Sequence, residues 1–316
     1  MSPDLVVIGN LLVDDLVFAD GRTFMGLAGG AALYAALAAR LWGVSVGVSS
    51  VAGSDYPAAA LDQLAARGVD LAGVRTLGRP GLRTWLLYEE RGRRVVHRLG
   101  CPAHEEVSPG PDDLPPGWRA ARAFHLAPTP LALQRALVAR LAAGAAGESG
   151  AGGLLSLDPH QPLSAETLSV WRPILAQLDL LFLGADEFQL GSEEGAKPAL
   201  QSLAAGRLQW IALKRGAEGG RLLDVKRGRE IAWPGCTQRA VEPTGAGDAF
   251  AGGFIAGLIA GAPLEGALEQ GVVSAGFAIE AVGAAGLIAA TPGEAARRLD
   301  ELRGTSRSRA PARSRP

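Results

Sequence analysis

The stretch that decides the fold is Val241-Glu242-Pro243-Thr244-Gly245-Ala246-Gly247-Asp248-Ala249-Phe250, in which a turn of small residues leads directly into an apolar helix. Gly245 and Gly247 carry no side chain where the first N–H groups of that helix lack partners, so an anion can reach those groups. Asp248 falls in the first helical turn, where the helix dipole favours its carboxylate. A carboxylate beside an anion site suits the removal of a proton from a hydroxyl group during phosphoryl transfer.

The length and charge of the chain favour an α/β protein that acts on a small molecule. With 316 residues, of which 48% are hydrophobic, the chain can bury a large core in one domain. A formal net charge of −1 gives no overall field that would attract nucleic acid or an anionic membrane, so we expect neither partner. The longest uncharged stretch of interest, between Asp248 and Glu265, is shorter than the roughly 20 residues that a membrane-spanning helix needs.

The cysteines and the N-terminal segment indicate a cytoplasmic protein. Cys101 and Cys236 are too few for a disulfide framework and indicate a reducing compartment. No basic segment precedes the first apolar run, as it would in a signal peptide. We expect a monomer or a homodimer.

Patterns typical of strands and of helices alternate along most of the chain. Short apolar runs that predict buried strands occupy 4–9, 44–51, 124–127, 154–158 and 180–183, and helical patterns occupy 29–43, 131–143 and 166–178. This alternation predicts an α/β fold with a doubly wound, mostly parallel sheet flanked by helices. Two strands joined by a tight turn at 81–99 predict a hairpin that projects from that sheet, and a last amphipathic helix is expected at 294–302.

The stretch 242–248 resembles the signature Asp-Thr-Thr-Gly-Ala-Gly-Asp of the ribokinase-like sugar kinases, also called the pfkB or phosphofructokinase-B family. The resemblance implies that Gly245, Ala246 and Gly247 form the anion hole for the transferred phosphoryl group. It also implies that Asp248 is the catalytic base.

The same resemblance covers nearly the whole chain and implies a ribokinase-like kinase domain at 1–303. It further implies a small β lid over the sugar, built from segments at about 15–28 and 81–100. The remaining residues, 304–316, carry arginines among Ser, Ala and Pro and offer little apolar area. We therefore expect them to form a disordered basic tail.

Three residues near the N-terminus are expected to bind the acceptor substrate. Asp14 follows Gly9 with the spacing of the family's Gly-x-x-x-x-Asp opening, which implies that Asp14 binds sugar hydroxyl groups from a loop after the first strand. Gly29 and Gly30 match a glycine pair whose backbone approaches the acceptor. Tyr34 stands where ribokinases carry an Asn that contacts ribose, so the sequence leaves the identity of the acceptor open.

The nucleotide is expected near the strand at 209–214. The resemblance implies that Lys214 approaches its phosphates and that Gly216, Gly219 and Thr244 lie beside it. The sequence contains no Walker A pattern ending in Gly-Lys-Ser/Thr, which argues against a phosphate-binding-loop NTPase.

Two departures from the family pattern bear on the ions. Glu187 matches the Glu of the family's Asn-x-x-Glu motif, which implies that it holds Mg²⁺ through water, but Gly184 stands at the Asn position. Glu242 stands where many members have an Asp that helps to bind a monovalent cation, and Pro243 follows it with a fixed φ. We therefore expect potassium to stimulate activity only weakly.

Together these features predict an ATP- and Mg²⁺-dependent kinase that phosphorylates a hydroxyl group of a sugar or polyol. A nucleoside kinase of the same family and a ligand-binding protein without turnover remain alternatives, the second because Tyr34 and Gly184 replace family residues. The retention of Asp248 argues against a pure binding protein. The sequence does not distinguish ATP from ADP as the donor, and the histidines at 97, 104, 125 and 160 show no zinc-ligand spacing.

Overall fold

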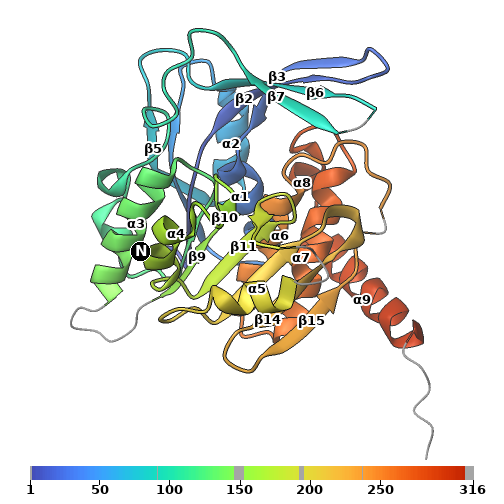
Figure 1. The fold of residues 1–316 in the computed structure, drawn as a ribbon. Helices are drawn as coiled ribbons and strands as arrows, with labels where there is room; N and C mark the ends of the chain where they lie inside the picture. Colours follow the sequence, from blue (N-terminus) through green and yellow to red (C-terminus); the bar gives the residue numbers. More distant parts are fainter. Residues whose placement is uncertain (1, 91, 146–152, 192–195, 237, 310–316) are drawn as a thin grey trace, which may run out of the picture.

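A nine-stranded sheet runs through the part of the chain that this computed structural model describes, residues 2–90, 92–145, 153–191, 196–236 and 238–309 (Figure 1). Its strands, in spatial order, are β15 (Arg229–Trp233), β14 (Gly220–Asp224), β13 (Trp210–Lys214), β11 (Leu180–Gly184), β9 (Leu154–Leu157), β8 (Ala123–Leu126), β1 (Leu5–Ile8), β4 (Val46–Ala52) and β5 (Val69–Thr76). Neighbours from β13 to β5 are parallel, whereas β14 is antiparallel to both β13 and β15. The predicted doubly wound, mostly parallel sheet is confirmed.

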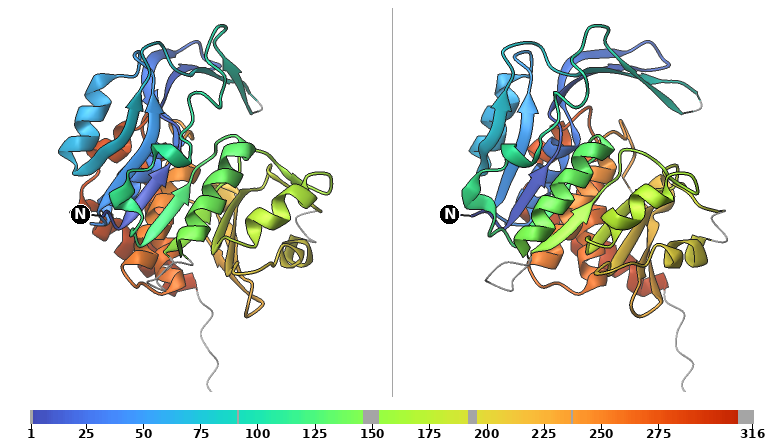
Figure 2. Two further views of the ribbon diagram at one scale, coloured as in Figure 1. Left: turned by 90° about the vertical axis from the view of Figure 1, so that its left-hand side faces the viewer. Right: turned by 60° about the vertical axis from the view of Figure 1, so that its left-hand side comes forward.

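Helices cover both faces of this sheet, and β1 illustrates why. Leu5 and Val7 pack into one hydrophobic core, and Val6 and Ile8 pack into another. Because successive side chains of a strand point to opposite faces, a continuous apolar run must be covered on both sides. One face carries α1 (Ala31–Leu41), α2 (Ala58–Ala66), α6 (Ala246–Ile259), α7 (Leu264–Ile279), α8 (Ala285–Ala289) and α9 (Pro292–Arg309), and the other carries α3 (Leu131–Ala145), α4 (Leu168–Leu175) and α5 (Ala196–Ser202) (Figure 2).

A second, four-stranded sheet lies over one end of the main sheet (Figures 1 and 2). Its strands, in order, are β3 (Thr23–Gly29), β2 (Leu12–Val17), β6 (Arg83–Tyr88) and β7 (Arg93–His97), and we call it the small sheet. The hairpin predicted at 81–99 forms β6 and β7. Two further short strands, β10 (Leu163–Ser164) and β12 (Phe188–Gln189), pair with each other elsewhere.

The small sheet corrects the expected position of Asp14, which lies in β2 and not in a loop. Asp14 is opposite Leu27 of β3 and Thr84 of β6. The pairing partner Thr84 lies far along the sequence, so the local pattern around Asp14 contains no sign of the strand. The segments expected to form a lid, 15–28 and 81–100, fall largely within the strands and hairpins of the small sheet.

The C-terminal boundary also needs correction, because α9 continues through Arg309 and the expected tail at 304–316 is therefore partly helical. Arg303 anchors the helix to α7, with its Nε 2.8 Å from Glu269 Oε2. Once a helix is formed, each further residue costs little, so an extension of this kind needs no apolar face of its own. Residues 310–316 lie outside the described part of the chain.

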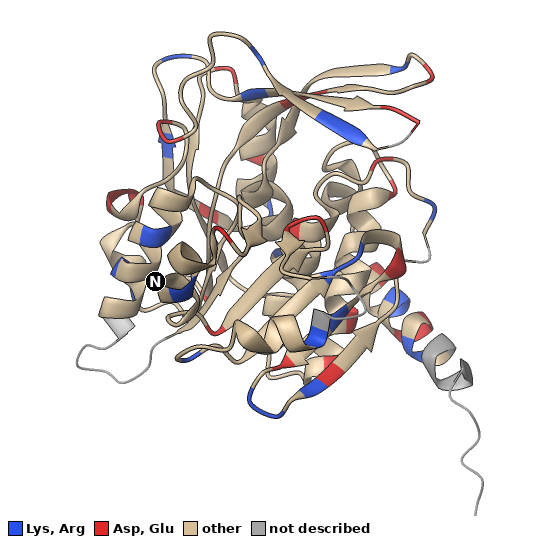
Figure 3. Cartoon of the chain, viewed as in Figure 1, with Lys and Arg blue, Asp and Glu red and all other residues tan. Residues whose placement is uncertain are grey.

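The distribution of charged and apolar residues over the helices and strands fits the near-zero net charge of the sequence. Acidic and basic residues are interspersed over the elements in Figure 3, and the formal net charge is −1. None of the helices in the described ranges combines the length and the apolar character needed to cross a membrane.

Candidate active site

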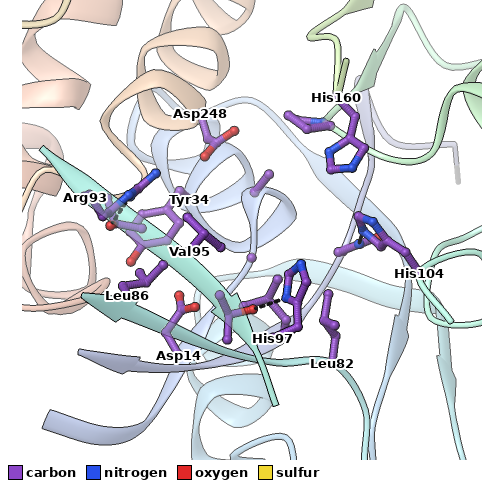
Figure 4. A pocket seen from close by; sticks show the side chains of 17 residues that line it. Asp14, Tyr34, Leu82, Leu86, Arg93, Val95, His97, His104, His160 and Asp248 are labelled. Atoms are coloured by element: carbon purple, nitrogen blue, oxygen red, sulfur yellow. Dashed lines mark hydrogen bonds between the residues drawn. The ribbon is translucent and has the colours of Figure 1, made fainter. Parts of the chain in front are cut away.

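The candidate site is a cavity at the carboxyl ends of β1 and β8. After β1 the chain moves outward through β4 and β5 and then returns to β8 on the opposite side of β1. Loops diverge at such a reversal of strand order, and open α/β sheets bind their ligands there. The cavity measures about 210 Å³ and is lined by Asn10 after β1, Pro128 after β8 and His160 after β9. Residues of the small sheet and of α6 close it (Figure 4).

The turn before α6 has the geometry that the glycine-rich stretch predicts. Gly245 precedes the helix with φ 77°, in the left-handed region that favours glycine. A Cβ atom at Gly245 would lie 2.2 Å from Tyr34 Cδ1, so the turn packs directly on that aromatic ring. No side chain caps the N-terminus of α6, which leaves its first amide groups available to a ligand. This combination fits an anion site.

Asp248 lies in the first turn of α6 and lines the cavity (Figure 4). Burial raises the pKa of its carboxyl group to about 6, with a further contribution from the nearby Asp158 carboxylate, and Lys214 and Arg93 partly oppose the rise. The group is therefore ionised at neutral pH but more basic than an ordinary aspartate. Such a carboxylate suits general base catalysis.

We expect this pKa to appear in the pH dependence of activity. A general base acts only when deprotonated, so kcat/KM should fall as the pH drops through about 6. Burial also raises the pKa of Asp14 to about 7, so the acid limb should begin near neutrality. Initial rates between pH 5 and 8, with the coupling enzymes in excess at every pH, provide the measurement. A flat profile over that range would contradict the assignment of Asp248.

A buried charge cluster lies next to the same turn. Lys214, at the end of β13, forms an ion pair with Asp158, which directly follows β9. A Cβ atom at Gly247 would lie 3.2 Å from Lys214 Nζ, so the ammonium group is close to the turn. Burial alone would lower the pKa of Lys214, but the carboxylates of Asp158 and Glu187 outweigh it and raise that pKa. The cation therefore stays charged beside the candidate anion site, where phosphates were expected.

The residues present fit a magnesium ion in this cluster. Glu187 Oε2 accepts a hydrogen bond of 2.6 Å from the Gly184 amide, and burial and the Asp158 carboxylate raise the pKa of Glu187. Asp158 Oδ1 is buried without a hydrogen-bond partner among the described residues. Two carboxylates with an unused oxygen suit Mg²⁺, which usually takes one or two protein carboxylates and fills its other positions with water and phosphate. The ranges given above contain no group of three or more His, Cys, Asp and Glu side chains that could hold a metal, so the protein ligands of such an ion would be these two carboxylates.

Gly184, which replaces an Asn of the family motif, leaves space for this arrangement. A Cβ atom there would lie 2.5 Å from Asp186 Oδ1 and 3.1 Å from Glu187 Oε2. The glycine thus allows both carboxylates to fold back toward the end of β11. Gly216 and Gly219 form the turn between β13 and β14 and are not among the cavity-lining residues, so their place beside a nucleotide stays a prediction.

Of the three residues expected to bind the acceptor, Asp14 and Gly30 line the cavity, whereas Gly29 packs against Asp14 and is not among the lining residues. Burial together with the Glu242 carboxylate raises the pKa of Asp14. A Cβ atom at Gly29 would lie 2.0 Å from Asp14 Oδ2. One at Gly30, which has φ 103° and lines the cavity, would lie 2.2 Å from the Asn10 carbonyl oxygen. The absence of a side chain at both glycines therefore lets the backbone before α1 lie close to Asp14 and Asn10.

Glu242 connects the turn to the small sheet. Its side chain is fully buried and accepts hydrogen bonds from the Tyr88 hydroxyl, from the Thr244 amide at 2.7 Å and from the Gly283 amide at 3.4 Å. The Thr244 hydroxyl in turn lies 2.7 Å from the Tyr88 hydroxyl and accepts a 2.7 Å hydrogen bond from Arg93 Nη1. Thr244 also lines the cavity, whereas its expected contact with a nucleotide stays a prediction.

Sequence reasoning missed several residues of this site. Arg93, Val95 and His97 are every second residue of β7, and all three line the cavity. Because alternate residues of a strand share a face, the predicted hairpin could have shown that these three side chains point the same way. Asp158 carries a weaker signal, a carboxylate directly after a buried strand. Asn10 carried no recognisable signal.

Comparison with known proteins identifies a family and relatives that this chain resembles. The family model for pfkB family carbohydrate kinases matches residues 3–290. A cytidine kinase from Thermococcus kodakarensis is 30% identical over 275 residues, covering 85% of this chain and 93% of that protein. An ATP-dependent ribose-1-phosphate kinase from Halopiger xanaduensis is 32% identical over 268 residues, covering 82% of this chain and 84% of its own. Among solved structures, a ribokinase II candidate from E. coli in complex with ATP and Mg²⁺ has a TM-score of 0.74 at 20% identity, covering 95% of this chain and all of that one.

Proposed function

The chain belongs to the pfkB family of carbohydrate kinases and is a phosphotransferase with a hydroxyl acceptor, and from that premise we propose that it transfers the γ-phosphate of ATP to a hydroxyl group of a sugar. The acceptor is a free sugar, a polyol or the sugar of a nucleoside. The observation that carries the proposal is Asp248, a carboxylate of raised pKa that lines the cavity at the uncapped N-terminus of α6.

In this mechanism Asp248 removes the proton of the acceptor hydroxyl group as that oxygen attacks the phosphoryl group. The amides of Gly245, Ala246 and Gly247 bind the phosphoryl oxygens, and the ammonium group of Lys214 adds a positive charge beside them. Glu187 and Asp158 would hold Mg²⁺, which would supply further neutralisation of the phosphate charge. Asp14, Gly29 and Gly30 orient the acceptor, and the small sheet acts as a lid that excludes water.

The donor and the acceptor class rest on relatives. The E. coli neighbour was solved with ATP and Mg²⁺, and the Halopiger relative is named ATP-dependent, which favours ATP over ADP here. The Thermococcus relative is named a cytidine kinase, which gives a nucleoside acceptor specific support beside the free sugar. A binding protein without turnover would have no use for a base at Asp248, and we therefore set that alternative aside.

The test is a panel of sugars, polyols and nucleosides in a coupled nucleotide-release assay, with ATP and ADP as alternative donors and with Mg²⁺ present or chelated. We expect ATP- and Mg²⁺-dependent phosphorylation of at least one acceptor. Product formation should be checked independently by mass, because a coupled assay also reports simple ATP hydrolysis. Absence of a phosphorylated product across the whole panel would contradict the proposal.

Potassium should stimulate this enzyme only weakly. Both oxygens of Glu242 are engaged by neutral donors, namely Tyr88, the Thr244 amide and the Gly283 amide, so the turn before α6 is held without a cation. Activity should be measured with potassium exchanged for a large organic cation at constant ionic strength, so that screening does not change. A fall of about tenfold or more, equivalent to about 1.4 kcal/mol of transition-state stabilisation, would contradict this prediction.

A further inference from the structure

Three histidines that are far apart in the sequence meet at one end of the cavity. His97 lies in β7, His104 in the following loop and His160 after β9, and all three line the cavity (Figure 4). The ring centroids of His104 and His160 are 4.7 Å apart with an interplanar angle of 82°, and those of His97 and His104 are 6.4 Å apart. With Asn10 and Thr84 they form what we call the histidine end.

Hydrogen bonds hold two of these rings, those of His104 and His97, in place. Asn10 Nδ2 lies 2.6 Å from His104 Nε2, and Thr84 Oγ1 lies 3.3 Å from His97 Nδ1. Asn10 is 4% exposed, and its other amide atom, Oδ1, is buried without a partner among the described residues. A buried amide oxygen without a partner costs free energy unless a ligand or a water completes its bonding. The histidine end is thus ordered and still has unused polar capacity.

The histidine end carries no permanent charge. The charged residues that line the cavity are Asp14, Arg93 and Asp248, and Figure 4 places Arg93 and Asp14 across the cavity from His104. Burial lowers the pKa of His104 to about 4 and also lowers that of His160, and the positive charge of one ring would disfavour that of another. The exposed Glu105 opposes both shifts without reversing them. At neutral pH His104 and His160 therefore present uncharged rings with hydrogen-bond donors and acceptors.

These properties discriminate between possible occupants. Among the described residues that line the cavity, no Lys or Arg lies at this end to neutralise a phosphate group, so a second anionic group on the acceptor fits poorly. A free sugar has a puckered, non-aromatic ring and lacks the flat π-face that stacks on imidazole. A planar, uncharged heterocycle can stack against imidazole and exchange hydrogen bonds with imidazole and amide edges, and Leu82 and Pro128 supply apolar surface beside it.

We propose that the histidine end binds the base of a nucleoside acceptor, with His104 and His160 hydrogen-bonding to its edge while the sugar lies between Asp14 and Asp248. The inference rests on the proposed kinase function and narrows its substrate class to nucleosides. His104 and His160 are then the residues that determine acceptor specificity.

The experiment compares acceptors that differ only at this end, namely cytidine, uridine, adenosine and inosine against D-ribose and ribose 1-phosphate. For the wild type, kcat/KM for at least one nucleoside should exceed that for D-ribose by about 10²-fold or more. His104→Ala and His160→Ala should each lower the ratio of kcat/KM for the preferred nucleoside to kcat/KM for D-ribose about tenfold or more, mainly by raising KM for the nucleoside. His104→Gln, which keeps a hydrogen-bonding group, should recover part of the ratio. Val96→Ala, the exposed neighbour of His97 in β7, is the control and should leave the ratio unchanged.

Calorimetric titration of the preferred nucleoside without nucleotide gives a readout independent of turnover. Binding to the wild type that weakens tenfold or more in His104→Ala supports the inference, even if no acceptor is phosphorylated and the proposed kinase function fails. A free sugar or ribose 1-phosphate that is phosphorylated better than every nucleoside would overturn the inference while leaving the kinase function intact. Histidine variants that leave the nucleoside-to-ribose ratio unchanged would overturn it equally.

Discussion

Replacing Asp248 with asparagine is expected to lower kcat by about 10²–10⁴-fold, the range that general base catalysis contributes. Asparagine keeps nearly the same shape but cannot accept the proton of the acceptor hydroxyl group. The carboxylate that it replaces is buried next to Asp158, so removing its charge relieves repulsion and should not destabilise the fold. The measurement is single-turnover and steady-state kinetics with the acceptor identified in the panel.

The control for this variant is Asp62→Asn, the same chemical change at an exposed position of α2, which should retain full activity. Nucleotide affinity, measured by calorimetry, should also be similar in Asp248→Asn and in the wild type, because the change affects the acceptor side of the turn. An Asp248→Asn protein that keeps more than about a tenth of the wild-type rate would exclude Asp248 as the base.

The sequence predicts most of the main sheet because the burial of each of these strands can be recognised from the apolar residues of that strand alone. The apolar runs that predict β1 and β11 are continuous, and parallel strands covered on both faces produce that pattern. The anion turn is also local, since Gly245, Gly247 and Asp248 lie within four residues of one another. Features of this kind need no knowledge of the rest of the chain.

The parts that could not be predicted depend on contacts between distant segments. Asp14 belongs to a strand because β2 pairs with β6, about 70 residues later in the register of Asp14 and Thr84. The histidine end brings together His97, His104 and His160, and the spacing of these residues along the sequence does not predict that they lie close together. Glu242 illustrates the same limit, since the donors Tyr88 and Gly283 that complete its bonding come from either side of it in the sequence.

Replacing Gly245 with alanine is the second change for which we expect a large effect. Gly245 has φ 77°, and an added Cβ atom would lie 2.2 Å from the ring of Tyr34, which is itself 1% exposed and cannot withdraw. The backbone conformation alone costs about 1–2 kcal/mol for a residue other than glycine. The collision must also shift the turn, and with it the amides that bind the transferred group. Displacing donors of this kind typically costs about 10²–10³-fold in kcat.

Gly261→Ala separates the two contributions to that loss. Gly261 has the same φ of 77° at the other end of α6, and an added Cβ atom there would meet nothing within 4 Å. Both variants should lose stability in thermal unfolding, but only Gly245→Ala should lose activity when both are assayed well below their melting temperatures. If Gly245→Ala is folded and keeps kcat within about threefold of the wild type, the turn does not hold the phosphoryl group, because a shift of the amides large enough to accommodate the methyl group would have to lower the rate.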